Sequence, residues 1–349
     1  MSKRHGDHKG AFERCLLSAG AFLLLPLSMA SQPGVRSGDA FVQARQLARG
    51  VNMLAWDPLW SDPVVAWFKW RLFKVIRAGG FQTVRVNLLA FYYMDAANRL
   101  DSRWLNTLDE VVNQATAAGL NVILDEHDYE ACGADPEGCR QKLLAFWEQI
   151  GSRYRNAPSS VLFEILNEPK GALTPDRWNA LLTAALAVIR HNNANRMVVI
   201  GPAASNTYPA LDSLQLPEHD HNIIVTVHYY NPFSFTHQGA AWAPPEIQAG
   251  KNIHWGSVAD RARLEHEFDT IAAWGKAHQR PVLLGEFGTL ETAPLPDRVA
   301  WTTAVARAAT KRGFPWVYWQ FEDKFGVYDM AKDRWVEPIH DALMAAKTR

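Results

Sequence analysis

The sequence has few cysteines, and its charges cancel. Three of its 349 residues are cysteine, and its 36 lysines and arginines equal its 36 aspartates and glutamates. A chain of this length buries most of its apolar surface, so it does not need disulfides or a metal to hold it together. With no net charge, the chain has no global field that would favour nucleic acid or an anionic membrane as a partner. A neutral polymer suits such a surface.

Long hydrophobic runs are also missing, apart from one near the N-terminus. Residues 15–27 are apolar, follow basic residues between positions 3 and 14, and precede small residues at positions 28 and 30. This order is typical of a secretory signal peptide, and the run is too short to anchor the chain across a bilayer. The sequence therefore predicts a signal peptide over residues 1–30. It also predicts a secreted mature chain without a membrane anchor, extracellular or periplasmic, over residues 31–349.

The cysteines that remain after signal removal form a closely spaced pair. Removal of the segment takes away Cys15 and leaves Cys132 and Cys139. In an oxidising compartment, such a pair favours a disulfide. A zinc site would need two more soft ligands nearby, and the sequence offers none. We therefore expect a Cys132–Cys139 disulfide, and neither a metal nor a cofactor.

Apolar, β-rich runs alternate with amphipathic stretches nearly to the C-terminus. The runs predicted as strands are 50–54, 83–88, 121–127, 160–167, 197–201, 222–230, 281–287 and 314–321. The stretches predicted as helices include 102–118, 139–154, 175–191, 258–278 and 296–312. No Gly-rich phosphate loop follows the first strand, which argues against a doubly wound sheet. Eight mostly continuous apolar strands alternating with helices predict a single-domain (β/α)₈ barrel, the TIM-barrel fold.

Polar residues end several of these apolar strands, where barrel enzymes carry their reactive groups. Glu168 follows the fourth strand within the run Asn167-Glu168-Pro169, and Glu286 ends the seventh. Arg, His, Tyr, Asn and Trp residues end neighbouring strands. Glycoside hydrolysis requires such a pair, because one carboxyl protonates the leaving oxygen while the other attacks or stabilises the anomeric carbon.

These positions give the whole mature chain a resemblance to glycoside hydrolase family 5, the family of many cellulases and mannanases. The matching residues, in chain order, are Arg85, His127, Asn167, Glu168, Pro169, His228, Tyr230, Glu286 and Trp319. The resemblance implies a secreted, retaining endo-β-1,4-glucanase whose partner is a β-linked polysaccharide or oligosaccharide. A β-1,4-mannanase or mixed β-glucanase on the same machinery is the alternative, and we expect a monomer.

The resemblance also implies how the two carboxylates divide the work. Glu168 would be the general acid and later the base, so it needs a raised pKa in the free enzyme. Glu286 would be the nucleophile and must stay ionised. Arg85 and the Tyr230 hydroxyl would support that ionised state, because nearby positive charge and hydrogen bonds favour a carboxylate. Arg85 could instead serve only as a structural ion pair of the barrel, a role compatible with the catalytic one.

Four further residues would hold the sugar. By the same resemblance, Asn167 would hydrogen-bond the sugar 2-hydroxyl, a contact that strengthens in the oxocarbenium-like transition state. His127 and His228 would position hydroxyl groups and the acid/base, and Trp319 would form the floor under the sugar at the cleavage point. A buried core histidine at 228 and a purely packing Trp319 remain open as alternatives.

Aromatic residues concentrate in the predicted loops that follow the strands, and flat rings suit sugar faces. The possible platforms are Trp56, Trp60, Tyr129, Phe235 and Trp242. Trp67, by contrast, falls in a helical pattern, and we expect it in the core.

Two other classes of protein share parts of this pattern. A carbohydrate-binding barrel that has lost catalysis would have a substituted acid or nucleophile, but both glutamates are present. A metal-dependent barrel hydrolase could use the cluster Asp125, Glu126, His127 and Asp128. That chemistry usually requires a His-x-His pair on the first strand, which the sequence lacks.

The predicted secretion can be tested on exported protein. Mass spectrometry should find a mature N-terminus near Ser31, because the signal peptide is removed, and a bond between Cys132 and Cys139, because export exposes both thiols to oxidation. An intact N-terminus, or two free thiols on exported protein, would contradict this prediction.

Overall fold

The structure is a computed structural model that describes residues 39–346. The chain divides into two units, Met1–Val35 and Arg36–Arg349, and only the second is described below. The predicted signal peptide, residues 1–30, lies outside the described residues. None of the helices among residues 39–346 has the length and apolar character needed to cross a membrane.

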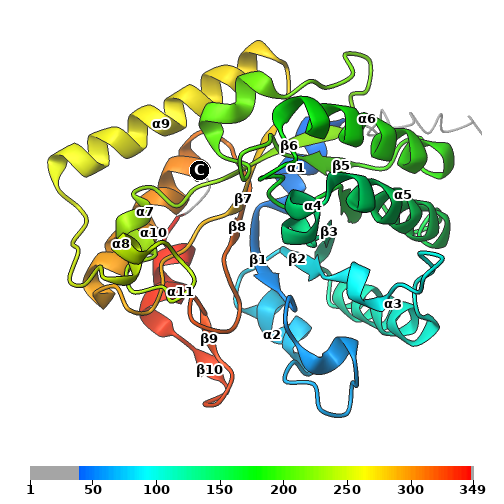
Figure 1. Cartoon of the computed structure of the whole chain (residues 1–349). Coiled ribbons are helices and arrows are strands. Elements are labelled where there is room, and N and C mark those ends of the chain that lie inside the picture. The colour runs from blue at the N-terminus through cyan, green and yellow to red at the C-terminus, as the bar shows by residue number, and fades with distance from the viewer. Residues whose placement is uncertain (1–38, 347–349) are drawn as a thin grey trace, which may run out of the picture. The chain divides into compact units, whose positions relative to one another are not determined.

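Eight parallel strands close into a barrel in chain order, which confirms the predicted (β/α)₈ fold (Figure 1). The strands are β1 (Arg49–Met53), β2 (Thr83–Leu88), β3 (Asn121–Glu126), β4 (Val161–Glu164), β5 (Val198–Ile200), β6 (Ile223–His228), β7 (Val282–Glu286) and β8 (Trp316–Tyr318). Several strands end before the apolar run does. After β4, for example, Ile165 and Leu166 lie beyond the last residue of the strand but are still buried, so hydrophobicity alone did not mark the strand end.

The helices surround the strands, and the five predicted ones match α3, α5, α6, α9 and α10. The helices are α1 (Ala40–Leu47), α2 (Arg71–Ala78), α3 (Ser102–Ala117), α4 (Tyr129–Ala134), α5 (Pro136–Arg153), α6 (Pro175–Asn192), α7 (Phe233–Thr236), α8 (Pro245–Gln248), α9 (Val258–Ala277), α10 (Leu295–Lys311) and α11 (Glu337–Met344). A short antiparallel pair, β9 (Tyr328–Asp329) and β10 (Arg334–Trp335), follows β8.

The interior of the barrel changes from apolar to polar along β3 and β4. Helix α1 packs Ala40, Ala44 and Leu47 into a cluster with one inward residue from most strands: Ile123, Leu162, Val199, Ile224, Leu283 and Val317. Two residues further along β3 and β4, on the same strand face, stand Asp125 and Glu164. The barrel therefore has an apolar floor beneath polar side chains, and these lie toward the C-terminal strand ends where barrel enzymes carry their sites.

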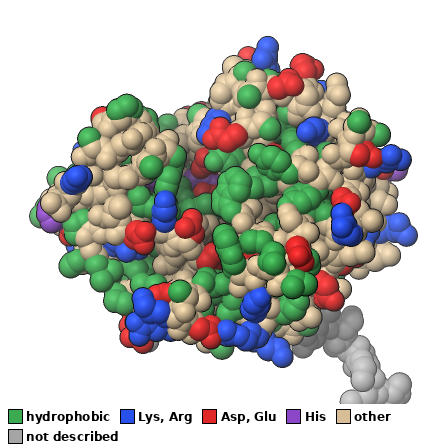
Figure 2. Space-filling model, turned by 60° about the horizontal axis from the view of Figure 1, so that its bottom comes forward, with side chains coloured by type: hydrophobic (Ala, Val, Ile, Leu, Met, Phe, Trp, Pro, Cys, Tyr) green, Lys and Arg blue, Asp and Glu red, His purple; other side chains and the backbone are tan. Residues whose placement is uncertain are grey.

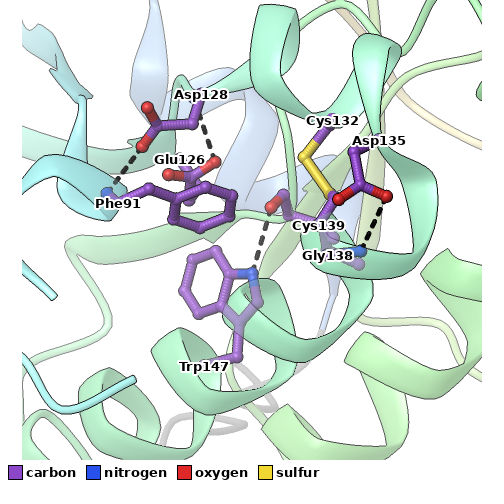
Figure 3. Close-up of a disulfide and its surroundings, with 9 residues drawn as sticks. Phe91, Glu126, Asp128, Cys132, Asp135, Gly138, Cys139 and Trp147 are labelled. Atoms are coloured by element: carbon purple, nitrogen blue, oxygen red, sulfur yellow. Dashed lines mark hydrogen bonds between the residues drawn. A yellow bond between two sulfur atoms is a disulfide. The ribbon is translucent and has the colours of Figure 1, made fainter. Parts of the chain in front are cut away.

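The expected disulfide is present and joins Cys132 of α4 to Cys139 of α5 (Figure 3). Between the two cysteines, the Asp135 carboxylate accepts a hydrogen bond from the Gly138 backbone N–H at 3.1 Å and so caps α5. Helix α4 comes three residues after the end of β3. The disulfide therefore fastens the loop that follows β3 to a long helix of the barrel wall.

Candidate active site

The Arg85 side chain is fully buried and uses every donor it has. Its Nε and Nη2 donate to the two carboxylate oxygens of Glu164 at 2.7 and 2.9 Å. Its Nη1 donates to Asn52 Oδ1 and to Glu286 Oε1, both at 2.8 Å. Nη2 also donates to Asn167 Oδ1 at 2.8 Å. All five N–H groups of the guanidinium are therefore engaged, and they link β1, β4 and β7 to β2.

Glu286 ends β7 with both carboxylate oxygens held by donors. Oε1 accepts from Arg85, and Oε2 accepts from the Tyr230 hydroxyl at 2.9 Å. Burial raises the pKa of Glu286, while His228 and the positive charge of Arg85 act to lower it. The geometry thus supplies the donors that an ionised carboxylate needs in a buried place.

Glu168 is held differently, at one oxygen and by a neutral ring. Its Oε1 lies 2.8 Å from Nδ1 of His228, whose own pKa burial lowers to about 4. Burial raises the pKa of Glu168 to about 7, against the lowering effect of His127, Lys170 and Arg85. Glu168 adopts a positive φ of 37° in the loop after β4. One oxygen each of Glu168 and Glu286 lie within 4.8 Å of one another.

His127 and Trp319 form a stacked pair beside the carboxylates. The centroids of their rings are 5.7 Å apart and the rings are nearly parallel. The Tyr129 ring packs edge-on against the His127 ring, with the centroids 5.4 Å apart. His127 Nδ1 lies 2.5 Å from Asp125 Oδ2, and burial lowers the pKa of His127 to about 4. Gly288 leaves room for the Trp319 backbone, because a Cβ added there would lie 2.1 Å from the Trp319 carbonyl oxygen. The predicted site residues on β2, β3, β4, β6, β7 and β8 therefore converge in one place.

The five possible sugar platforms do not share one environment. Trp56 and Trp242 are exposed, at 66% and 59%, and Tyr129 is half-buried. Trp60 and Phe235 are buried, at 5% and 0%. The indole N–H of Trp60 donates to the Leu54 carbonyl, and its ring packs on Trp104, so Trp60 belongs to the core. The proposal of a platform at Trp60 or Phe235 is wrong, because neither ring can face a ligand.

The prediction for Trp67 was also wrong, but in the other direction: a residue expected in the core is exposed. The sequence pattern predicted a helix and a core position, but the residue lies outside α2 and is 62% exposed. Figure 2 shows hydrophobic side chains gathered around a hollow in one face of the molecule, with acidic side chains among them. Exposed aromatic rings of this kind have the flat apolar faces that sugar rings stack on.

The acidic cluster at the end of β3, Asp125 to Asp128, does not form a metal site of its own. Asp125 and Glu126 are neighbours on one strand, so their side chains leave opposite faces. Asp125 turns inward to Asn87, His127 and Arg85. The Glu126 carboxylate accepts a hydrogen bond from the backbone N–H of Asp128 (Figure 3). The Asp128 carboxylate in turn accepts one from the backbone N–H of Phe91.

Among the described residues, one group has side chains close enough to hold a metal ion: Glu168, His228 and Glu286. Both oxygens of Glu286 already accept hydrogen bonds, one of them from the Arg85 cation. A second cation would meet that guanidinium at short range, so the charge arrangement suits a nucleophile better than a metal ligand.

Three supporting residues were not singled out from the sequence. Glu164 pairs with Arg85, Asn52 accepts from it, and Asn206 lies 3.4 Å from the His228 ring. Glu164 could have been found from the sequence, because a lone carboxylate within a buried apolar strand needs a buried partner. Asn52 and Asn206 gave none, because asparagines at strand ends and in loops are ordinary.

Comparison with known proteins identifies the class. The model of the cellulase family, glycosyl hydrolase family 5, matches residues 46–325, and the chain belongs to this family. The predicted resemblance is thereby confirmed.

Individual relatives carry endoglucanase names. Endoglucanase H of Acetivibrio thermocellus is 28% identical over 293 residues, which are 80% of this chain and 30% of that protein. Endoglucanase A of Clostridium longisporum is 28% identical over 326 residues, 85% of this chain and 60% of that protein. The chain thus spans less than two thirds of these relatives. The solved endoglucanase Cel5A of Thermotoga maritima is 39% identical, with a TM-score of 0.83, over 87% of this chain and 99% of that one.

The raised pKa of Glu168 predicts a pH-dependent cost in stability. Its folded-state pKa of about 7 exceeds the ordinary 4.5. The folded protein therefore binds more protons than the unfolded chain between these values, and stability falls as pH rises through them. Glu168→Gln removes that loss. The difference in free energy of unfolding between this variant and wild type should therefore depend on pH. It should favour the variant more at pH 8 than at pH 4, by on the order of 2–3 kcal/mol.

Denaturant unfolding at the two pH values measures this difference. Glu110→Gln is the matched control, because Glu110 is exposed on α3. It should show the same small difference from wild type at both pH values. If Glu168→Gln behaves like Glu110→Gln, the carboxyl group is not held in a site that penalises its charge.

Proposed function

We propose that the protein is a secreted endo-β-1,4-glucanase that cleaves β-glucan by double displacement with net retention. The observation that carries the proposal is the pair Glu168 and Glu286, with one oxygen of each within 4.8 Å of the other. Retaining glycosidases have carboxyl groups about 5–5.5 Å apart, whereas inverting enzymes need roughly 6.5–9.5 Å to admit a water. The endoglucanase names of the relatives support the same activity.

In the first step, Glu286 attacks the anomeric carbon while the bond to the leaving oxygen breaks. Glu168 gives its proton to that oxygen, so the departing sugar leaves as a neutral alcohol. A pKa of about 7 keeps Glu168 protonated over the acidic range where it must act as an acid. Arg85 and Tyr230 hold the attacking carboxylate in place, so little ordering is needed at the moment of reaction.

In the second step, Glu168 is ionised and serves as the base. It takes a proton from water as the water oxygen attacks the anomeric carbon, and the bond to Glu286 breaks. The site then returns to its starting protonation state. The Asn167 side chain, whose Oδ1 accepts from Arg85 and whose Nδ2 lies 3.4 Å from Nε2 of His127, suits the role of donor to the sugar 2-hydroxyl.

The second candidate substrate is β-1,4-mannan. Cel5A of Thermotoga maritima was solved with cellobiose and also with mannotriose, at 38% identity to this chain in each case. Glucan and mannan differ at one ring carbon, and the same pair of carboxylates serves both.

A panel of polysaccharides separates the two. We expect the release of reducing ends to be fastest from carboxymethylcellulose and barley β-glucan, slower from mannan, and absent from xylan. Falling viscosity with few new reducing ends would mark endo cleavage. Mannan as the best substrate would replace glucanase with mannanase, and insensitivity to a chelator would argue against the metal-dependent class.

The two carboxylates are separated by azide rescue of their alanine variants. On polysaccharide, Glu168→Ala should lose roughly 10²–10⁴-fold in kcat, because a sugar alcohol leaves poorly without a proton. Glu286→Ala should lose essentially all turnover, because no other group forms the glycosyl-enzyme bond. On an aryl cellobioside with an acidic phenol, Glu168→Ala should still undergo the first step, and azide should then release the intermediate as the retained β-glycosyl azide.

Azide acting on Glu286→Ala replaces the nucleophile instead, so its product should be the inverted α-glycosyl azide. NMR of the anomeric proton distinguishes the two azides. Glu110→Ala, on an exposed helix face, serves as the control and should need no rescue. The opposite stereochemistry in the two variants would show that the roles of Glu168 and Glu286 are reversed.

A further inference from the structure

Three consecutive residues after β5 have a left-handed backbone although none is glycine. Ala204, Ser205 and Asn206 have φ values of 57°, 58° and 53°. L-residues visit this region as single residues, with asparagine among the few that tolerate it. Such a run persists only when the surrounding structure holds it, and strained backbone of this kind clusters at functional sites.

The left-handed turn, Ala204 to Asn206, is fastened between the two segments that carry the acid/base. The Ser205 backbone N–H donates to the carbonyl of Pro169, the residue after Glu168, at 3.1 Å. The carbonyl of Asn206 accepts from the backbone N–H of His228 at 2.9 Å. The turn thus joins the Glu168 segment to the end of β6.

The turn delivers the Asn206 side chain to the far side of the His228 ring. Asn206 is fully buried, and it lies over Gly201, where an added Cβ would come within 2.3 Å of its Oδ1. Its Nδ2 lies 3.4 Å from Nε2 of His228. On the other side of the ring, Nδ1 lies 2.8 Å from Glu168 Oε1.

With its Nδ2 toward the ring, the Asn206 amide can only donate, so it pairs with an Nε2 that carries no proton. We infer that Asn206 is a positioning residue that fixes His228 as the Nδ1–H tautomer, with the imidazole donating to Glu168. This role rests on the function proposed above. An Nδ1–H donor satisfies Oε1 whether Glu168 is protonated or ionised. The other oxygen of Glu168 is then free to exchange its proton with the leaving group and with water.

The ring sits among charged groups that could otherwise set its state. The titratable groups around it, on or just after β2, β3, β4 and β7, are Arg85, His127, Glu164, Glu168 and Glu286. Burial keeps the pKa of His228 near 4, so the ring is neutral in the working range. Because a neutral imidazole has two tautomers, a fixed neighbour is needed to choose between them.

Long-range ¹H–¹⁵N spectra of the full chain labelled with ¹⁵N-histidine report the tautomer directly. The His228 signals are assigned by their loss in His228→Gln. At pH 8, we expect a protonated Nδ1 and a bare Nε2 in wild type. Asn206→Asp replaces the donor with an acceptor and keeps a residue tolerated at positive φ, so Nε2 should become protonated. A protonated Nε2 in wild type, or no change in Asn206→Asp, overturns the inference.

Activity adds a second readout. Asn206→Gly keeps the positive φ and removes the side-chain amide, so both tautomers of His228 should appear. Its kcat/KM on polysaccharide should fall roughly five- to tenfold. The loss should be smaller for the first step on an aryl cellobioside, which needs little protonation. Ala204→Gly, at an exposed position in the same turn, is the control and should match wild type in spectrum and rate.

The two proposals fail separately. Wild type without glycosidase activity overturns the proposed function, and the spectra still decide the tautomer. An active wild type whose Asn206→Gly variant keeps full kcat/KM and an unchanged spectrum overturns the role of Asn206 alone.

Discussion

The site depends on a single buried cation. The guanidinium of Arg85 contacts Glu164 through two hydrogen bonds and donates to Asn52, Asn167 and Glu286 at 2.8 Å each. A group with fewer donors could not hold these side chains together, and lysine, with three donors and no planar fork, could not replace it. One side chain thereby fixes the positions of Glu286, the proposed nucleophile, and of Asn167, which precedes the proposed acid/base Glu168.

The same cation separates the chemistry of the two carboxylates. Arg85 faces three carboxyl groups, those of Asp125, Glu164 and Glu286, so one positive charge meets up to three negative ones. Burial raises the pKa of Asp125 to about 7 and also raises the pKa of Glu164, while the charge of Arg85 acts to lower both. Glu286 is in direct contact with the cation, whereas the hydrogen-bond partner of Glu168 is a neutral imidazole. These different electrostatic surroundings suit the proposed roles of the two glutamates, Glu286 as nucleophile and Glu168 as acid/base.

The sequence predicted the barrel and the residues at its strand ends because both follow from local patterns. Alternating apolar and amphipathic runs are properties of neighbouring residues, and the end of an apolar strand places Glu286 without knowledge of the rest. Burial of loop residues does not follow in this way: Trp60 and Phe235 became core and Trp67 became surface because partners distant in sequence decide loop packing. The contact of Asn206 with His228 could not be predicted for the same reason. It depends on a left-handed turn, and the residue types in that turn did not predict its backbone conformation.

Stability and function occupy different levels of this barrel. The floor is the apolar cluster in which α1 packs against inward residues such as Ile123 and Leu162. Above it stand the buried charges, and at the strand ends lie the positive φ of Glu168 and the left-handed turn before His228. Each of these features disfavours the folded state by itself. They are tolerated because the floor and the surrounding helices bury apolar surface independently of them, so the site can hold an acid with a raised pKa without losing the fold.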